Sequence, residues 1–329
     1  MNPYIGHSSQ LSGAEEYRLV GGKGDGMRLL RVYNGKGVEM TLSLDRCADI
    51  SRLTFKGGNL GYFSACGYVA PAYYENTPMG FLKSFTAGFL TTCGFNNVGS
   101  PNVDEGEQLT LHGTIGNTPC EYAYWEEDEE KIEAHARVLD EGIFARKLRL
   151  DRVITLYKTE NKIEIADTVT NTGDVEAPLE ILYHMNMGYP LLSPESELYI
   201  PSFNVRPRND RAAEDLDTWN QVIEPQANFE EQCYFHDFDE KGLAAIYSPQ
   251  LDAGLAIRFD TKELAYFTQW KMMGVRDYVM GLEPGNCHPD GRAKMREEGA
   301  LDILQPGEKR NFTVTIDLLD GKEAFEAIK

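Results

Sequence analysis

Residues 265–289, AYFTQWKMMGVRDYVMGLEPGNCHP, hold the pattern from which the fold can be predicted. Residues 265–272 are rich in aromatic and β-preferring side chains, and residues 279–282 form a short apolar run that Pro284-Gly285 follows. Two runs of this kind, separated by a few polar residues and a glycine, are typical of two strands joined by a turn. We therefore expect a pair of strands here, with Pro284-Gly285 ending the second.

Glu283 is a carboxylate at the end of an apolar strand in this stretch. Because side chains alternate along a strand, Val279, Gly281 and Glu283 share one face. One interpretation is a strand-end carboxylate in solvent or in an ion pair, which is the commoner arrangement. The other is a general base in a partly dry pocket, where burial raises the pKa of the carboxyl toward the working pH.

The same strand pattern recurs through almost the whole chain. It is clearest in residues 131–140, 146–160 and 161–173, where apolar and polar side chains alternate and turn residues separate the runs. Helical patterns are confined to a short stretch near residues 77–85 and to residues 322–329. The strands do not alternate with helices. The chain therefore predicts an all-β fold, a large antiparallel β-sandwich with few short helices.

The sequence shows no linker, low-complexity block or repeat of fixed period. We expect a single domain over residues 1–329, with residues 1–25 as an N-terminal arm, since sandwiches of this length are common. Residues 64–105 are irregular and rich in glycine, proline, asparagine and aromatic side chains. A long irregular stretch inside a compact domain often forms the wall of a binding site.

The composition narrows the classes of partner. A net charge of −20 repels polyanions, so we expect no nucleic-acid binding. No apolar run reaches the length of a membrane span and the first residues do not resemble a signal peptide, so we expect no membrane association. Six cysteines without ligand spacing favour a cytoplasmic location and argue against a metal site or a disulfide scaffold. A monomer and a homodimer are both compatible with the sequence.

Three histidines lie in strand-like segments with polar neighbours: His112, His184 and His236. A single histidine in a sheet is most often a surface residue or a hydrogen-bonded core residue. His184 is the best candidate for a functional role, because alternation places it on one face with Leu182 and Asn186. Two polar residues in succession on one face of an apolar strand indicate a lined pocket.

Four short motifs, in this order, resemble the aldose 1-epimerase (galactose mutarotase-like) superfamily, in the branch known only as aldose-1-epimerase family proteins. They are LHG at residues 111–113, YHMNMGYPLL at 183–192, TQWKM at 268–272 and GLEP at 281–284. Each motif is weak alone, and the order and spacing of all four carry the resemblance. The resemblance implies a large β-sandwich that binds a sugar in an open groove.

The resemblance also implies roles for individual residues. It makes His184 the general acid and Glu283 the general base, on either side of one groove and within reach of a single pyranose. It makes His112 a second histidine that hydrogen-bonds the sugar, Arg46 an arginine that contacts sugar hydroxyls, and Gln269 a glutamine beside the base. The family's additional aspartate has no clear counterpart here. The His236-Asp237 pair is the nearest candidate, and Asp237 could equally be a surface residue.

Anomer exchange suits these side chains, because it needs a proton removed from O1 and a proton given to the ring oxygen O5. Neither step requires a metal or an organic cofactor. The sequence thus predicts a carbohydrate 1-epimerase acting on a free aldose or an aldose derivative, with a small-molecule sugar as its partner. Two alternatives remain: a carbohydrate-binding protein without turnover, and an isomerase or lyase acting on a modified or phosphorylated sugar. The second would use Arg206, Arg208 and Arg211, which could also form a solvated ion-pair surface.

Alternation along residues 266–272 gives a prediction about orientation. We expect Gln269 and Lys271 to face the groove, and Trp270 to face away or to line its rim. A solvated edge position is an equally good interpretation of Lys271. Together with Asn186 and His236, these residues complete the set predicted to bind the substrate.

Overall fold

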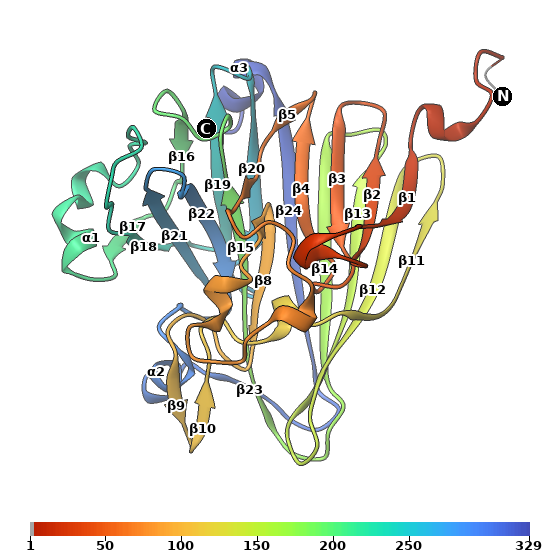
Figure 1. The fold of residues 1–329 in the computed structure, drawn as a ribbon. Coiled ribbons are helices and arrows are strands. Elements are labelled where there is room, and N and C mark those ends of the chain that lie inside the picture. Colours follow the sequence, from red (N-terminus) through yellow and green to blue (C-terminus); the bar gives the residue numbers. More distant parts are fainter. Residues whose placement is uncertain (1–2) are drawn as a thin grey trace.

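The computed structural model describes residues 3–329, and antiparallel strands form most of it (Figure 1). The all-β sandwich predicted from the sequence is confirmed. Its largest sheet has eight strands in the order β11-β12-β13-β14-β24-β20-β19-β16. Their bounds, in that order, are Cys120–Glu127, Lys131–Glu141, Lys147–Tyr157, Lys162–Asn171, Lys309–Asp320, Ala253–Asp260, Lys241–Ser248 and Glu197–Tyr199.

A second sheet contains the strands on which the sequence analysis centred. Its order is β17-β18-β21-β22-β15-β23, and β8 also pairs with β15. The bounds are Asn204–Pro207, Gln232–Asp237, Tyr266–Met273, Tyr278–Gly285, Ala177–Met187 and Asp302–Leu304, with Leu90–Phe95 for β8. The predicted strand pair is therefore the hairpin β21–β22. Pro284 and Gly285 are the last two residues of β22, so Glu283 lies within the strand.

The third sheet is formed by the first five strands in sequence order, which lie over β11–β14 in Figure 1. They are β1 (Gly13–Arg18), β2 (Arg28–Tyr33), β3 (Val38–Ser43), β4 (Asp49–Phe55) and β5 (Gly58–Asn59). Two two-stranded sheets, β6–β7 and β9–β10, complete the strands, with bounds Tyr62–Phe63, Ala87–Gly88, Asn102–Asp104 and Glu107–Leu109. Part of the segment expected as an arm is thus an edge strand.

The helices are few and short. The α-helices are α1 (Asp210–Glu214), α2 (Arg292–Glu297) and α3 (Gly321–Glu326). Of the two helical patterns expected, the one near residues 77–85 is a single 3-10 turn at Gly80–Lys83, and the C-terminal one is α3. The other 3-10 turns are Ser8–Gln10, Gly22–Gly24, Pro71–Tyr73, Ile115–Asn117 and Leu216–Thr218. Within residues 3–329, no helix combines the length and apolar character that crossing a membrane requires.

One hydrophobic core joins the three sheets, and it explains the alternation seen in the sequence. Along β12, every second side chain is buried and contributes to this core. β15 differs, because nearly all of its side chains are buried on both faces. Met185 and Leu282 on β15 and β22 point into the core between the sheets. The next side chains along these strands, His184 and Glu283, therefore point to the opposite face, where the candidate site lies.

Candidate active site

A pocket of about 280 Å³ lies on the face of the second sheet that points away from the main core. Its floor is formed by side chains of four neighbouring strands: Cys233 of β18, Thr268 and Trp270 of β21, Glu283 of β22 and His184 of β15. Loops supply the walls, with Met79, Phe81, Leu82, Phe85, Gly99, Ser100, Pro101, Leu111, His112, Arg208, Glu231 and Pro289. The structure thus brings His184, Glu283 and His112 to one pocket. His184 and Glu283 lie next to each other on its floor, however, and not on either side of a groove as predicted.

His184 and Glu283 are neighbours across β15 and β22. His184 Nδ1 lies 3.2 Å from Glu283 Oε1, and both side chains are almost fully buried. The two atoms are not aligned for a hydrogen bond, and neither has another partner within residues 3–329. The hydroxyl of Thr268, on β21, is also buried without a partner. Buried polar atoms are normally hydrogen-bonded, so three such atoms in one pocket indicate a place for a polar ligand.

The environment favours uncharged forms of both groups. Burial raises the pKa of the Glu283 carboxyl well above its usual range, and the charge of Glu231 raises it further, while Arg208 opposes the shift. Burial lowers the pKa of His184 to about 4. Both shifts favour an uncharged pair, in which a protonated Glu283 carboxyl lies beside a neutral imidazole that keeps one N–H.

Gly281 makes room for the Glu283 carboxyl. The two residues lie on the same face of β22, and a Cβ atom at position 281 would lie 2.0 Å from Glu283 Oε1. The same Cβ would lie 3.2 Å from the Cβ of Trp270. Because the carboxyl is the end of a flexible side chain, an alanine at position 281 would displace it while leaving the strand in place.

We therefore expect Gly281→Ala to lower the rate of the reaction at this site by about 100-fold, the scale of loss for a small misplacement of a reacting group. Thermal unfolding should change little. The sharpest measurement is a double-mutant cycle with Glu283→Gln, because Gly281 acts through Glu283 and the two losses should not add. Losses that added fully would show that Gly281 acts by another route.

His112 presents a hydrogen-bond donor to the pocket. Its Nδ1 accepts a hydrogen bond from the backbone N–H of Gly99 at 3.3 Å, so in the neutral ring the proton is on Nε2. The ring packs against Phe81 and His184, with centroids 5.0 and 5.5 Å away. Burial lowers the pKa of His112 well below its usual range, and the proximity of His184 and Arg208 lowers it further. His112 is thus a neutral, fixed donor.

Charged groups form the wall of the pocket on the β18 side. Glu231 accepts a hydrogen bond from the indole N–H of Trp270 at 2.7 Å. Arg208 donates to Asp290 at 2.8 Å, and also to the Ser100 hydroxyl at 3.0 Å. Arg208 is therefore already paired with a carboxylate, and Glu231 fixes the orientation of the Trp270 ring, whose centroid lies 5.2 Å from that of His184.

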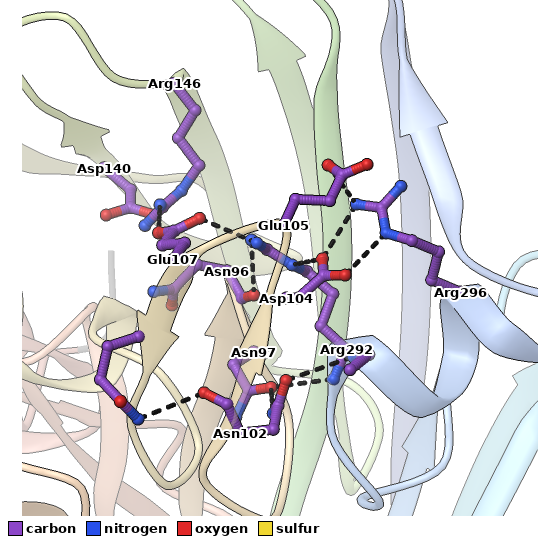
Figure 2. Close-up of polar contacts among 12 residues, drawn as sticks. Asn96, Asn97, Asn102, Asp104, Glu105, Glu107, Asp140, Arg146, Arg292 and Arg296 are labelled. Atoms are coloured by element: carbon purple, nitrogen blue, oxygen red, sulfur yellow. Dashed lines mark hydrogen bonds and ion pairs between the residues drawn. The ribbon is translucent and has the colours of Figure 1, made fainter.

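A buried polar cluster holds the loop that carries Gly99, Ser100 and Pro101 (Figure 2). Arg292 donates to Asp104 at 2.6 Å, to Glu107 at 2.8 Å and to the carbonyl of Asn96 at 3.2 Å. The amide of Asn97 donates to the carbonyls of Gly99 and Ser100, and its oxygen accepts from the backbone N–H of Arg292. This side of the pocket is therefore held in place by α2 and β9–β10.

Residues 24–318 match the family described as "Domain of unknown function (DUF4432)". The chain belongs to this family. No curated protein matches the sequence. Within residues 3–329, no three His, Cys, Asp or Glu side chains converge in a way that could hold a metal ion.

Solved structures show where this DUF4432 chain stands among known folds. A Klebsiella pneumoniae protein provisionally described as an aldose 1-epimerase superposes with a TM-score of 0.88 at 25% identity, covering 97% of this chain and 90% of that one. Galactose 1-epimerase from Lactobacillus acidophilus gives 0.65 at 13% identity, covering 94% and 99%. A galactose mutarotase-like protein from Clostridium acetobutylicum gives 0.67 at 13% identity, also covering 94% and 99%. The resemblance inferred from the four motifs is confirmed.

The prediction that Gln269 and Lys271 face the groove is wrong. Trp270 lines the pocket, whereas Gln269 and Lys271 point to the opposite face. Gln269 donates to the carbonyl of Trp219, and Lys271 to that of Thr218. Lys271 is not a solvated edge residue either, since it is buried, and burial lowers its pKa to about 8. The cause is the register of the hairpin, which pairs Trp270 with Gly281, so that Trp270 lies on the same face of the sheet as Gly281 and Glu283.

Two other predicted substrate ligands also lie outside the pocket. His236 is on the inner face of β18, where its ring nitrogens contact Gln269 at 3.3 Å and the Ser202 hydroxyl at 2.9 Å. Asn186 shares the face of His184, but it is fully buried and its amide donates to the carbonyl of His184 at 2.9 Å. The Oδ1 atom of Asn186 is buried without a partner among the described residues.

Arg46 lies beside a separate, much smaller cavity of about 10 Å³. It donates to the carbonyl of Val69 at 3.1 Å, and burial lowers its pKa to about 10. The contact with the sugar predicted for Arg46 is therefore not supported, because the loop around Val69 covers its guanidinium. Asp237, the uncertain candidate for the additional aspartate, pairs with Arg206 at 3.1 Å at the edge of the sheet and does not line the pocket.

Several residues of the pocket were not predicted as site residues. Thr268 could have been found from the register of the hairpin, since it pairs directly with Glu283. Glu231 and Arg208 follow no local pattern, and they reach the pocket because β17 and β18 pair with each other beside β21. The arginines proposed as phosphate ligands are all paired: Arg206 with Asp237, Arg208 with Asp290, and Arg211 with Glu214 and Asp215.

Proposed function

We propose that this protein is a carbohydrate 1-epimerase that interconverts the α and β anomers of a free aldose. The observation that carries the proposal is that three adjacent strands, β21, β22 and β15, each place one buried polar side chain in the pocket. These side chains are Thr268, Glu283 and His184, and each has a buried polar atom without a hydrogen-bond partner. A sugar hydroxyl both donates and accepts hydrogen bonds, and it can satisfy these atoms together. Trp270 and the apolar side chains of the loops suit the C–H face of a sugar ring.

The contact between Glu283 and His184 suggests how the protons move. In ring opening, one oxygen of Glu283 takes the proton of O1, while the other passes its own proton to Nδ1 of His184. Nε2 of His184 gives its proton to O5 as the C1–O5 bond breaks and the C1=O1 double bond forms. Rotation about C1–C2 presents the other face of the carbonyl, and the reverse transfers close the ring as the other anomer. The 3.2 Å separation is short enough for this relay once the carboxyl turns.

The relay keeps the assigned roles and starts from the uncharged pair that burial favours. Glu283 still removes the proton from O1, and His184 still protonates O5. The pair begins and ends uncharged, with one proton on the carboxyl and one on the imidazole, so no charge has to be created in a buried site. The reaction requires neither a metal nor an organic cofactor.

The proton count predicts a bell-shaped dependence of the rate on pH. Below about pH 4, His184 becomes doubly protonated and can no longer accept a proton from Glu283. Above the raised pKa of Glu283, the carboxyl has no proton to pass to Nδ1, so His184 cannot give up its Nε2 proton to O5 without becoming an anion. We therefore expect a plateau through neutral pH, with a loss on the acid side near 4 and a loss on the alkaline side. Polarimetry between pH 3 and 10 tests this.

A thermal-shift screen of free sugars and sugar phosphates is the first experiment, because a ligand of the folded state raises its apparent stability. Each sugar that stabilises the protein is then followed by exchange NMR between its α and β signals, with and without the protein. We expect neutral aldoses to bind and their exchange to accelerate. If bound sugars exchange only at their spontaneous rate, the protein is a carbohydrate-binding protein and the proposal fails.

A further inference from the structure

We propose that the sugar is neutral and carries an apolar group at C5, as in a 6-deoxyhexose. The inference rests on the proposed function and names the class of substrate for the same pocket. Its basis is the difference between the two walls of the pocket, together with the position that the reacting atoms of the sugar must take between them.

The two walls lie on opposite sides of the reacting pair. Across the sheet the strands run β18, β21, β22 and β15, so Glu283 of β22 is nearer the wall with Glu231, and His184 of β15 is farther from it. Beyond His184 lie aromatic side chains, with the Phe85 ring centroid 5.3 Å from that of His184 and the Phe81 ring 4.9 Å from Phe85.

The chemistry of anomer exchange orients the sugar along the direction from Glu283 to His184. O1 lies at Glu283 and O5 at His184, since these groups exchange protons with those oxygens. C5 is bonded to O5 and lies farther along the same direction, away from Glu283. The substituent on C5 therefore extends toward Phe81 and Phe85, and the hydroxyls on C2 and C3 lie on the side of Glu231.

The wall beyond His184 does not suit a hydroxymethyl group. Among the described residues its side chains are Met79, Phe81, Leu82 and Phe85, none of which can form a strong hydrogen bond with a hydroxyl. Met79 and Leu82 are half exposed and form the outer part of this wall, and Phe81 is buried and forms the inner part. Against the Phe81 and Phe85 rings, a C6 hydroxyl would lose water without gaining a partner from these side chains, whereas a methyl group would bury apolar surface. His112, which packs against Phe81, is the donor at this end, and it suits O4 on the carbon next to C5.

Charge argues for a neutral sugar. Arg208 is paired with Asp290, and the pocket also contains the carboxylate of Glu231. A phosphate or carboxylate on the sugar would meet this negative charge without a free cation to offset it. Hydroxyls, in contrast, can donate to Glu231.

The test compares matched sugars that differ only at C6, by exchange NMR with the full-length protein. The pairs are D-fucose with D-galactose, L-fucose with L-galactose, and L-rhamnose with L-mannose. In at least one pair we expect kcat/KM to favour the 6-deoxy sugar by about 10- to 100-fold, the discrimination that an apolar pocket achieves. If the parent hexose is equal or better in every pair that is accelerated, this inference fails while the proposed function stands. If no sugar is accelerated, both fail.

A variant of the apolar wall provides the control. Leu82 is 53% exposed and lies at the rim, so Leu82→Asn should not disturb folding. The new amide can hydrogen-bond a C6 hydroxyl, and we expect the preference for the 6-deoxy sugar to fall by about tenfold, toward the parent hexose. An unchanged preference, with the protein folded, would show that C6 does not meet this wall and would overturn the orientation.

Discussion

Replacing Glu283 by glutamine is expected to abolish anomer exchange while leaving sugar binding largely intact. Glutamine keeps the shape of the side chain above Gly281 and still hydrogen-bonds a hydroxyl, but it cannot take the proton of O1 or pass one to His184. Loss of a general base typically costs ~10²–10⁴-fold in rate. Exchange NMR gives the rate, and a thermal-shift titration of the same sugar gives the affinity. We expect the exchange rate to fall by this factor and the affinity for the sugar to change by no more than a few-fold.

Glu231 offers a matched control, because it is the other carboxylate in the pocket and its contact is with the indole of Trp270. Glu231→Gln should weaken binding, since the hydroxyls on its side lose a charged acceptor. The rate for bound sugar should remain close to that of the wild type. Glu283 would not be the base of this reaction if Glu283→Gln kept the wild-type exchange rate. The same would follow if Glu231→Gln lowered the rate for bound sugar as much as Glu283→Gln does.

The fold was predictable because its signal is local and repeated. In β12, β13 and β14, side chains alternate between the core and the other face, and this period is visible in the sequence without knowledge of the partner strand. The same reasoning placed His184 and Leu182 on one face of β15, where the structure finds them directed away from the main core.

The faces of β21 could not be predicted, because alternation fixes the relative positions of side chains within one strand only. The register of the hairpin decides which face of β21 lies on the same side of the sheet as Glu283. In the structure this register pairs Thr268 with Glu283. A shift of one residue in the turn would have brought Gln269 into the pocket instead. The sequence contains no feature that decides between these registers, since both faces of β21 carry polar and apolar side chains.

Residues that reach the pocket from loops were the least predictable. Arg46 was assigned through the resemblance, but the segment around Val69 covers it and separates it from the pocket. Glu231 and Arg208 lie beside β18 and β17, far in sequence from His184, and only the packing of the second sheet brings them together. Long-range placement of this kind depends on the whole fold, and short motifs contain no information about it.

Replacing His184 by asparagine is the second change with a large expected effect. Asparagine fits the buried position and can form a hydrogen bond, but it cannot receive a proton from Glu283 and deliver another to O5. We expect the exchange rate to fall by ~10²–10⁴-fold, with sugar binding retained. In any residual activity, the loss of rate near pH 4 should disappear, because the group that gains a proton there has been removed.

His112→Asn is the matched control for this variant, since the two rings are neighbours with centroids 5.5 Å apart. His112 has its Nδ1 bound to the N–H of Gly99 and acts as a fixed donor, so its loss should raise KM more than it lowers kcat. For His184→Asn we expect kcat to fall more than KM rises, because His184 takes part in the step in which protons move. If His184→Asn raised KM and left kcat unchanged, O5 would receive its proton from another group, and the relay through Glu283 and His184 would have to be abandoned even if Glu283 proved essential.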